Sequence, residues 1–288
     1  MTGGAGRVGR SVTEHLAECG HDVLAVDRIA PPLVRAGSAV VDLIDIRDLE
    51  RAFRHVDAVV HMARVPFPYA SAGYDAATRT WHKPDLVEDM ERFNLNLAMT
   101  YNVLGAALAV GAKKLVMGSS LAVYGFYYPS RPAFPDYLPI DETHPLRPDD
   151  HYGLSKRLGE ALADGFASKH TMGVISLRFP VIFEGDQSKL LAQQTTAIRG
   201  FGAFGTYLDV RDAARACRLA LETELSGHEA FNVCAPTTLM KQSTIDLARA
   251  FFPEISDIRR ADAGNWSGYD PGKARNILGF EAEHLVTL

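Results

Sequence analysis

The chain has 288 residues, of which 47% are hydrophobic and 23% charged, so it is large enough for one or two globular domains with a substantial core. Its formal net charge of −5 and the lack of a long basic run argue against a nucleic-acid partner. No apolar stretch is long enough to cross a membrane, and no basic-then-apolar leader precedes the first glycines, so we expect no membrane partner. Cys19, Cys217 and Cys234 lack metal-ligand spacing, and we interpret them as reduced, buried thiols of a cytoplasmic protein without a bound metal.

Helical and strand-like segments alternate along the first part of the chain. After the opening glycines, Val8, Val12 and Leu16 recur at four-residue steps and predict a helix that ends near Gly20. In chain order, the pattern then predicts a strand over 22–28, a strand over 38–45, a helix over 46–56, a strand over 57–63, a helix over 85–111 and a strand over 114–120. This alternation indicates parallel βαβ units, and the uninterrupted apolar strands indicate a sheet covered by helices on both faces.

The second part of the chain continues the pattern less regularly. We expect a strand over 173–183, a helix over 210–222 and a strand over 229–235, followed by a helical, loop-rich end. The stretches 65–84 and 126–148 are rich in proline and tyrosine and interrupt an otherwise compact pattern, which is typical of functional loops.

The opening stretch MTGGAGRVG carries glycines in two overlapping frames. Gly4, Gly6 and Gly9 fit G-x-G-x-x-G, whereas Thr2 and Gly3 begin the frame T-G-x-x-G-x-x-G. In either frame the glycines let the backbone approach a pyrophosphate, whose charge meets the free N–H groups at the start of the helix. The alternative is an ordinary helix entry without a ligand.

Asp27 ends the strand that follows the glycine loop, where a carboxylate is placed to bond the ribose 2′-hydroxyl of a dinucleotide. Such a carboxylate repels a 2′-phosphate, so we expect NAD as the cofactor, although the adjacent Arg28 leaves NADP open. A turn residue at a strand end is the alternative for Asp27. Together these features predict an α/β fold with a Rossmann-type, doubly wound parallel sheet.

A second group of residues carries chemistry. Ser120 lies at the end of the strand KLVMGSS, and Tyr152 and Lys156 stand four apart at the start of a helix, so they share one face. A tyrosine is a poor base at neutral pH, but a nearby ammonium stabilises its phenolate. We therefore predict that Ser120 holds a substrate oxygen, that Tyr152 removes its proton, and that the carbon beneath gives hydride to a nicotinamide. The Tyr-x-x-x-Lys pair alone has little specificity, and its position after the Ser-Ser strand end carries the argument.

These motifs resemble those of the extended short-chain dehydrogenase/reductase family, in the NAD-dependent epimerase/dehydratase group. The resemblance spans nearly the whole chain and includes TGGAGRVG, VVDLID, DAVVHMA, NLNLAMTYNVL, LVMGSSLAVYG, YGLSK, LRFPVIF, YLDVRDAARA, FNV and DPGKARNILGF. It implies that residues 1–172 form an NAD-binding domain. Residues 173–288 are expected to complete the sheet and form a small substrate-binding lobe.

The resemblance also assigns roles to single residues. Ser120, Tyr152 and Lys156 are the implied catalytic set, with Lys156 also holding the nicotinamide ribose. The implied cofactor-binding residues are Gly3, Gly6, Arg7, Val8, Gly9, Asp27, Arg28, Asp42, Leu43, Met62, Ala63, Asn96, Tyr152, Lys156, Phe179 and Pro180. Among them, Asp42 and Leu43 would flank the adenine, Met62 and Ala63 the ribose and phosphates, and Phe179 and Pro180 the nicotinamide.

In this family an apolar strand precedes the glycine loop, and no such strand stands before Thr2. It would lie in the middle of the sheet, between the strands at 22–28 and 57–63. Its loss would leave two rows of backbone hydrogen-bonding groups unpaired. We therefore expect a late start site or a shortened chain, and the alternative is that another segment fills the slot.

Departures from the family pattern narrow the substrate. Leu121 and Ala122 replace the acidic pair of the dehydratases, and Val181 replaces an asparagine that meets the diphosphate in sugar-nucleotide epimerases. The segment between Arg178 and YLDVRD is also short. The first departure argues against water elimination, whereas Val181 and the short segment favour a free sugar, a sugar acid or a related hydroxy compound, as in uronate dehydrogenases. Arg64 is a candidate for holding a substrate carboxylate or phosphate, and its alternative is a solvent-facing or ion-paired arginine.

The leading prediction is thus an NAD-dependent oxidoreductase that acts on a hydroxyl of a small sugar-like substrate. A sugar-nucleotide epimerase with tightly held NAD is the alternative, and a non-catalytic nucleotide-binding protein is the third reading. The resemblance further implies a homodimer through the helices at 85–111 and 150–168. We interpret His61 as a buried strand-end histidine, and Asp209 and Asp212 as caps of the following helix.

Overall fold

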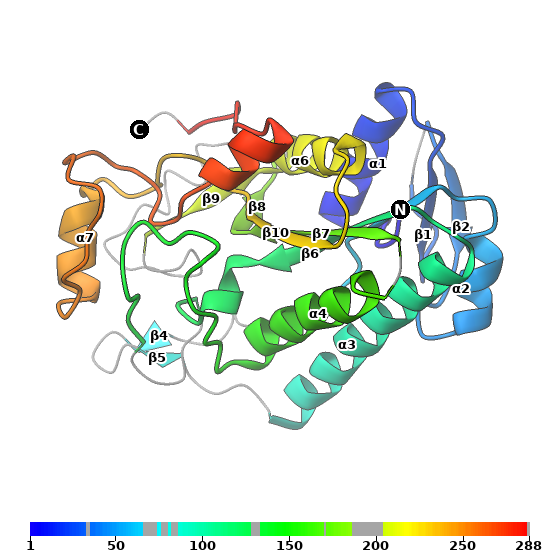
Figure 1. Ribbon diagram of the computed structural model, residues 1–288, viewed down its shortest axis with the longest axis horizontal. Helices are drawn as coiled ribbons and strands as arrows, with labels where there is room; N and C mark the ends of the chain where they lie inside the picture. Colours follow the sequence, from blue (N-terminus) through cyan, green and yellow to red (C-terminus); the bar gives the residue numbers. More distant parts are fainter. Residues whose placement is uncertain are drawn as a thin grey trace.

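A computed structural model of the protein describes residues 1–32, 35–65, 74–75, 80–81, 86–127, 133–169, 171–185 and 204–286. Figure 1 shows a central parallel sheet between two layers of helices. One layer contains α1 (Arg7–Glu18) and α6 (Val210–Glu222), and the other contains α2 (Ile46–Ala52), α3 (Leu86–Ala109) and α4 (His151–Ala167). This arrangement confirms the predicted α/β fold of the Rossmann type.

The sheet has two parts. Four parallel strands lie in the order β10 (His228–Asn232), β7 (Gly173–Phe179), β6 (Lys114–Ser120) and β3 (Ala58–His61). A separate parallel pair is formed by β1 (Leu24–Asp27) and β2 (Gly37–Val40). Every residue of β7 is buried, because helices cover both faces of the sheet.

Within the described residues, the two parts of the sheet meet at the start of the chain. Thr2 forms isolated parallel bridges with Val26 of β1 and His61 of β3. Its N–H donates to Val60 O at 2.9 Å, and its C=O accepts from the N–H of Met62 at 3.1 Å. The slot for the expected central strand is therefore where the sequence places it. Within the described ranges, only Met1 and Thr2 enter it.

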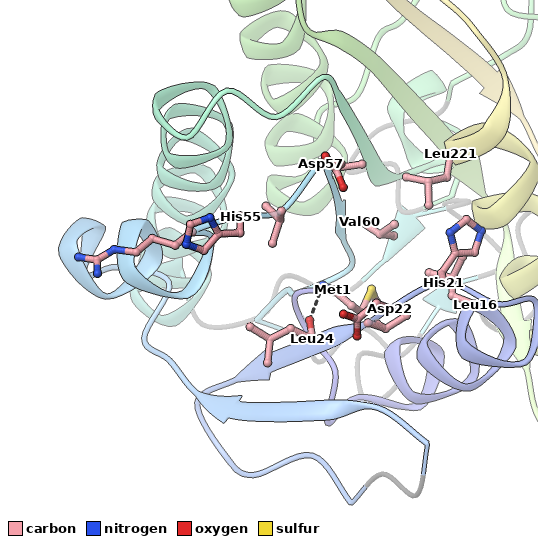
Figure 2. A pocket seen from close by; sticks show the side chains of 13 residues that line it. Met1, Leu16, His21, Asp22, Leu24, His55, Asp57, Val60 and Leu221 are labelled. Atoms are coloured by element: carbon pink, nitrogen blue, oxygen red, sulfur yellow. Dashed lines mark hydrogen bonds between the residues drawn. The ribbon is translucent and has the colours of Figure 1, made fainter.

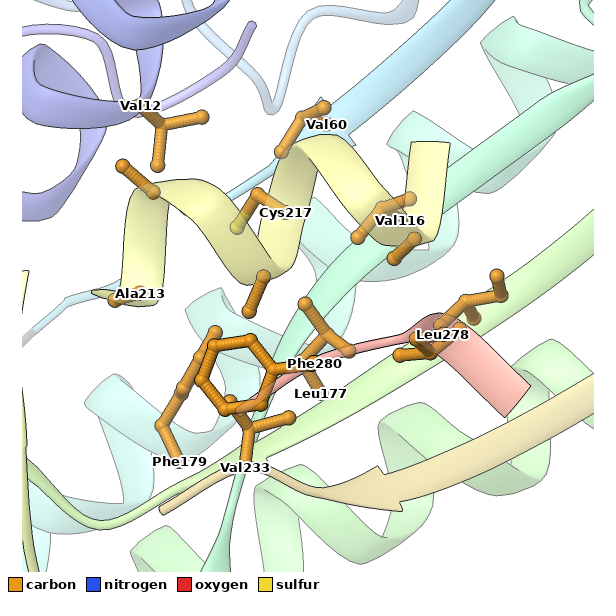
Figure 3. Packing of buried hydrophobic residues seen from close by; sticks show 14 of the residues in the cluster. Val12, Val60, Val116, Leu177, Phe179, Ala213, Cys217, Val233, Leu278 and Phe280 are labelled. Atoms are coloured by element: carbon orange, nitrogen blue, oxygen red, sulfur yellow. The ribbon is translucent and has the colours of Figure 1, made fainter. Parts of the chain in front are cut away.

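A core cluster on the α1 and α6 side explains why these helices pack here. Val12 of α1 and Cys217 of α6 are fully buried and face Val60, Val116 and Leu177 of the sheet (Figure 3). Burial of this kind stabilises by about 25 cal/mol for each Å² of apolar surface removed from water. The helix α1 thereby holds its N-terminus, with the glycine loop, at the end of the sheet.

The remaining elements differ in part from the sequence-based expectations. The strand predicted over 173–183 is two strands, because Pro180 has no N–H for a ladder and separates β7 from β8 (Val181–Phe183). β8 pairs in parallel with β9 (Tyr207–Asp209). The other elements are β4 (Tyr74–Asp75), β5 (Thr80–Trp81), η1 (Leu121–Tyr124), α7 (Thr244–Phe251) and η2 (Ala274–Leu278).

Two expectations concern segments that are only partly described. The predicted loop at 65–84 lies mostly outside the described residues, apart from the short pairing of β4 with β5. The predicted loop at 126–148 is described over 126–127 and 133–148. Among the helices in the described ranges, none is long and apolar enough to cross a membrane.

Candidate active site

The glycine loop packs against the end of β3. Gly3 has a φ of +76°, and a Cβ placed there would lie 2.6 Å from the backbone N of Ala63. A Cβ on Gly9 would lie 1.9 Å from the carbonyl oxygen of Gly3. Only glycine fits either position, so the loop closes tightly between β3 and α1.

The N-terminus of α1 faces a cavity with its positive end uncapped. Gly6 is the N-cap residue and supplies no side-chain hydrogen bond, and the first turn of α1 contains no acidic residue. The helix therefore presents N–H groups and the positive end of its dipole to a negatively charged ligand. These features fit the pyrophosphate of a dinucleotide.

The cavity at this helix end has a volume of about 510 Å³. Its wall contains every predicted cofactor residue from the loop to the end of β3, namely Gly3, Gly6, Arg7, Val8, Gly9, Asp27, Arg28, Asp42, Leu43, Met62 and Ala63, together with Val41, Arg64, Val65 and Met99. The remaining predicted cofactor residues, Asn96, Tyr152, Lys156, Phe179 and Pro180, do not line it. The residues present thus fit the adenosine and diphosphate of NAD.

The Asp27 carboxylate also forms hydrogen bonds within the protein that were not predicted from the sequence. Its Oδ2 accepts a hydrogen bond from the N–H of Ala5 at 3.0 Å, and its Oδ1 accepts from the N–H of Arg28 at 2.7 Å. The carboxylate therefore orders the glycine loop as well as lining the cavity. A ribose hydroxyl bound here would find an acceptor that is already held in place.

Asn96 of α3 fixes the chain just after β3. Its side-chain oxygen accepts from the N–H of Val65 at 2.8 Å, and its Nδ2 donates to the C=O of Val65 at 3.0 Å and to Arg92 O at 2.8 Å. The amide is thus engaged by the backbone. Its predicted contact with the cofactor stays a prediction, and in this structure Asn96 holds Val65, which lines the cavity.

The predicted catalytic lysine is held against the strand end. Lys156 Nζ donates to the C=O of Gly118 at 2.7 Å and lies 6.0 Å from the ring centroid of Tyr152. Burial lowers the pKa of Lys156 to about 8, and the charge of Arg64 adds to this effect while Glu160 opposes it. The ammonium is therefore poorly hydrated, and water screens its charge only weakly from the nearby Tyr152.

Ser120 and the start of α4 come together through a close backbone approach. The Oγ of Ser120 is buried and accepts from the N–H of Ala122 at 3.2 Å, which caps η1. Gly153 packs so closely on η1 that a Cβ there would lie 2.7 Å from Ala122 O. This contact brings the helix turn that carries Tyr152 against the strand end that carries Ser120.

Arg64 extends from the end of β3 toward the tyrosine. Its guanidinium lies 5.9 Å from the ring centroid of Tyr152, and the residue is exposed. Among the residues that the structure describes, no carboxylate forms an ion pair with it. Arg64 and Lys156 thus place two cations beside one tyrosine.

A buried polar network lies beneath these residues and was missed from the sequence. Arg178 of β7 donates to both carboxylate oxygens of Glu160 at 3.0 and 2.7 Å and to the hydroxyl of Tyr124 at 2.8 Å. Ser119 donates to Glu160 at 2.5 Å, and Tyr124 donates to Asn232 at 2.8 Å. The available indication was a charged residue, Arg178, inside an otherwise apolar strand, because such a charge must be paired.

Other expectations have mixed outcomes. Phe179 and Pro180 are buried at the end of β7, and Val181 begins β8. His61 is buried, as predicted, and its Nδ1 lies 2.7 Å from the hydroxyl of Thr2. Burial lowers the pKa of His61 to about 3, so the imidazole is neutral at physiological pH.

Two expectations, for Asp212 and for Cys19, need correction. Asp209 caps α6 as predicted, but Asp212 instead accepts hydrogen bonds from the N–H groups of Glu283 and His284 and holds the C-terminal segment. Cys19 is exposed, contrary to the expectation of three buried thiols, because it lies at the end of α1. Across the described ranges, no group of His, Cys, Asp and Glu could hold a metal ion.

The parallel sheet and the glycine loop define a dinucleotide-binding protein of the Rossmann type. The model of the NAD-dependent epimerase/dehydratase family matches residues 1–234, and the chain belongs to this family. NAD is the cofactor of the family, and the glycine loop, the uncapped α1 and Asp27 fit it.

Relatives and a solved structure agree with this assignment. The chain is 31% identical to an L-arabinose 1-dehydrogenase (NAD(P)(+)) of Haloferax volcanii, over 78% of this chain and 82% of that one. It is 27% identical to a uronate dehydrogenase of Pseudomonas syringae pv. tomato, over 79% and 70%, and 30% identical to a UDP-glucose 4-epimerase of Streptomyces lividans, over 62% and 50%. A short-chain dehydrogenase/reductase superfamily protein of Agrobacterium tumefaciens with bound NAD superposes with a TM-score of 0.70 at 25% identity, over 99% of this chain and 92% of that one.

Proposed function

We propose that the protein oxidises a hydroxyl group of a small sugar or sugar acid, with Tyr152 as the base. The observation that carries this proposal is the placement of Lys156 at 6.0 Å from the Tyr152 ring, bonded to the strand end that also bears Ser120. This arrangement matches a tyrosine base that needs a cation beside it and a hydroxyl to hold the substrate.

The roles of the residues follow from the chemistry of alcohol oxidation. Ser120 holds the substrate oxygen, and Tyr152 takes its proton, while Lys156 supplies positive charge to the phenolate. A nicotinamide, when bound, would supply the acceptor for the hydride of the carbinol carbon. The substrate thus loses a hydride and a proton, and the products are a carbonyl compound, the reduced cofactor and one proton.

Val181 and Arg64 favour a small, negatively charged substrate. Val181 begins β8 immediately after Pro180, where an epimerase would hold a diphosphate, and this favours a substrate without a nucleotide. The names of the arabinose and uronate relatives support the same class. Because Arg64 stands 5.9 Å from the Tyr152 ring, we assign it to a substrate carboxylate, which favours sugar acids over neutral sugars.

A substrate screen tests this proposal. Free aldoses and hexuronic acids are incubated with the purified protein and NAD, and reduction is followed by absorbance. We expect stoichiometric reduction of NAD, faster with acids than with neutral sugars. Interconversion of a sugar nucleotide without free reduced cofactor, by protein that retains NAD through purification, would instead establish the epimerase.

The role of Arg64 is tested by comparing Arg64→Ala with Arg64→Lys. For a sugar acid, the alanine variant should raise KM at least about tenfold, since a charge-assisted pair contributes about 1.5–3 kcal/mol. The lysine variant should recover part of the affinity. For a neutral aldose, KM should change little, and an equal loss for both substrates would remove the assignment.

We also propose a cytoplasmic homodimer. Val87, Met90 and Tyr101 are exposed apolar residues, and their spacing places them on one face of α3 at 100° per residue. Leu158 of α4 is exposed as well, and both helices form the expected interface. The cysteines in the described ranges are free thiols, which fits a reducing compartment.

A further inference from the structure

Arg7 is the first residue of α1, and its side chain links the cofactor cavity to a separate part of the fold. The residue is exposed and lines the cavity of about 510 Å³. Its Nη2 donates to the C=O of Ile182 in β8 at 2.6 Å. None of the three described residues of β8 lines that cavity. The arginine therefore reaches from the end of α1 that suits a diphosphate to a strand that does not itself line the cofactor cavity.

Backbone contacts hold the chain at the glycine loop on the side of β1 and β3. The amino nitrogen of Met1 donates to Leu24 O at 2.8 Å (Figure 2), and Thr2 bridges both strands. Toward β8, the described part of the chain has one hydrogen bond from the glycine loop, and it comes from the Arg7 side chain. The contact with β8 is thus the one that a ligand of Arg7 can change.

β8 belongs to a two-stranded sheet that follows the expected nicotinamide site. It begins directly after Phe179 and Pro180, and it pairs in parallel with β9. Within the described residues, neither strand pairs with the central sheet. Ile182 is only partly buried, where it packs against the core cluster of α1 and α6. The placement of β8 against the glycine loop therefore relies on this packing and on the bond from Arg7.

The charge and shape of a guanidinium suit two simultaneous contacts. It carries five N–H donors in a planar fork, and it binds phosphate oxygens with charge-assisted hydrogen bonds. In the described part of the chain, the bond to Ile182 is the one hydrogen bond of the Arg7 side chain, and no carboxylate pairs with it. Several donors therefore remain for a phosphate. Once a phosphate holds the guanidinium, the bond to Ile182 costs little further side-chain entropy.

We propose that Arg7 is a positioning residue that bridges the diphosphate of the cofactor and β8. The guanidinium donates to a phosphate oxygen and to the C=O of Ile182, and it fixes β8 against the N-terminus of α1. Cofactor binding thereby orders the chain after Phe179 and Pro180. The bridge concerns cofactor binding alone, and it does not depend on which hydroxyl compound the protein oxidises.

The amides of the β8–β9 pair report how well β8 is ordered. Alternate residues of a strand point to opposite neighbours, and the C=O of Ile182 points to Arg7. Phe183 therefore faces β9, and Leu208, which lies opposite Ile182, faces β8. Neither Phe183 nor Leu208 lines the cofactor cavity. Amide hydrogen exchange at these two positions thus measures the opening of β8 away from the direct contacts of a ligand in that cavity.

The test measures amide hydrogen exchange with and without saturating ADP, which carries a diphosphate but no nicotinamide. This ligand removes direct contacts of the nicotinamide from the comparison. We expect ADP to slow exchange at Phe183 and Leu208 at least about fivefold in the unchanged protein, since the diphosphate holds the guanidinium against β8. Adenosine, which lacks phosphate, should have no effect at these positions when compared at equal occupancy. Exchange at Leu115 in β6 should stay the same with both ligands.

Arg7→Met keeps most of the length of the side chain and removes its charge and its donors. This variant should bind ADP at least about tenfold more weakly, as for the loss of a charge-assisted hydrogen bond. At saturating ADP it should show no protection of Phe183 and Leu208. Arg35→Met is the matched control, because Arg35 is an exposed arginine that pairs with Glu18 at the other end of α1 and does not line the cofactor cavity. It should leave the ADP affinity and the protection unchanged.

Two results would overturn the bridge. Weaker ADP binding by Arg7→Met, with protection of Phe183 and Leu208 retained at saturation, would reduce Arg7 to a ligand of the phosphate. Absence of protection by ADP in the unchanged protein would also overturn it, and protection by NAD in that case would assign the ordering of β8 to the nicotinamide end. Neither readout depends on catalysis, so failure of the proposed sugar oxidation would leave this test unaffected.

Discussion

Tyr152 is the residue on which the proposed chemistry depends most directly. Tyr152→Phe keeps the ring near Lys156 and removes only the proton acceptor. We expect the rate to fall by about 10²–10⁴-fold, as for loss of a general base, with NAD affinity within a few-fold. Steady-state rates and fluorescence titration with the cofactor measure the two effects. More than a tenth of the original rate in the Tyr152 variant would exclude this tyrosine as the base.

The Asp27 carboxylate supplies both a negative charge and a hydrogen bond to the glycine loop, and two variants distinguish these contributions. Asp27→Asn keeps an oxygen that accepts from the N–H of Ala5, whereas Asp27→Ala removes it. We expect both variants to narrow the preference for NAD over NADP, because the negative charge no longer opposes a 2′-phosphate. Only the alanine variant should also lose thermal stability. Dissociation constants for both cofactors provide the check, and an unchanged ratio in both variants would mean that the carboxylate does not contact the ribose.

A buried ion pair between Arg178 and Glu160 joins β7 to α4. Arg178 and Glu160 are both buried, and removing one partner leaves a buried charge unpaired, which costs about 3–5 kcal/mol. We expect Glu160→Leu to lower the free energy of unfolding by about that much in urea denaturation. The exposed pair Arg147–Asp136 provides the control, since Arg147→Ala should cost no more than about 1 kcal/mol. Similar losses at both sites would contradict this reading.

Patterns within one segment predicted most of the elements. The four-residue steps of Val12 and Leu16 gave α1, and Gly20 with a φ of +92° ends it as expected. The helix over 210–222 has the predicted bounds, because Asp209 caps it and its apolar face is regular. Such features are local, and periodicity reports them directly.

Contacts between distant segments were outside the reach of those patterns. The bond from Asp27 to Ala5 and the pair Glu160–Arg178 depend on how the chain returns on itself. The residues that line the cofactor cavity, from Gly3 to Ala63, were predicted from the family resemblance. The hydrogen bonds of the Asn96 amide to the backbone of Val65 were not predicted. Asp212 was misread because a cap on α6 and a cap on the C-terminal segment look alike in sequence.

At the scale of the whole molecule, the exposed face of α3 leads to a prediction about assembly. The double variant Met90→Glu with Tyr101→Glu places charges on a face that we assign to the dimer, where they would be desolvated or repelled. We expect a monomer by light scattering, with the secondary structure retained. Ile277→Glu changes an exposed apolar residue of η2 and should leave the mass unchanged. If the unsubstituted protein is already a monomer by light scattering, the proposed dimer interface is wrong.

We expect the free energy of unfolding to fall as the pH is lowered from 8 into the mildly acidic range. Burial lowers the pKa of the Met1 amino group to about 5 from 8, and of His61 to about 3 from 6.5. Both groups bind protons more readily in the unfolded chain, so stability is greatest above pH 8 and falls as the pH decreases. We expect losses of up to about 1.4 kcal/mol for each pH unit below 8 from Met1, and a further share below 6.5 from His61. Urea unfolding measures the slope, and acetylation of Met1 should flatten it between pH 8 and 6.5.

Thr2 joins two strand edges beside the cofactor cavity, and this links the order of those edges to cofactor binding. Its backbone joins β1 to β3, and the next residue, Gly3, already lines the cofactor cavity. If ordering of the sheet edge raises the affinity for NAD by some factor, the cofactor must favour ordering of that edge by the same factor. Saturating NAD should therefore protect the amides of Val60 and Leu24 from exchange, although neither residue lines the cofactor cavity. Thr2 and Gly3 are thus the point through which cofactor binding should stiffen the edges of β1 and β3.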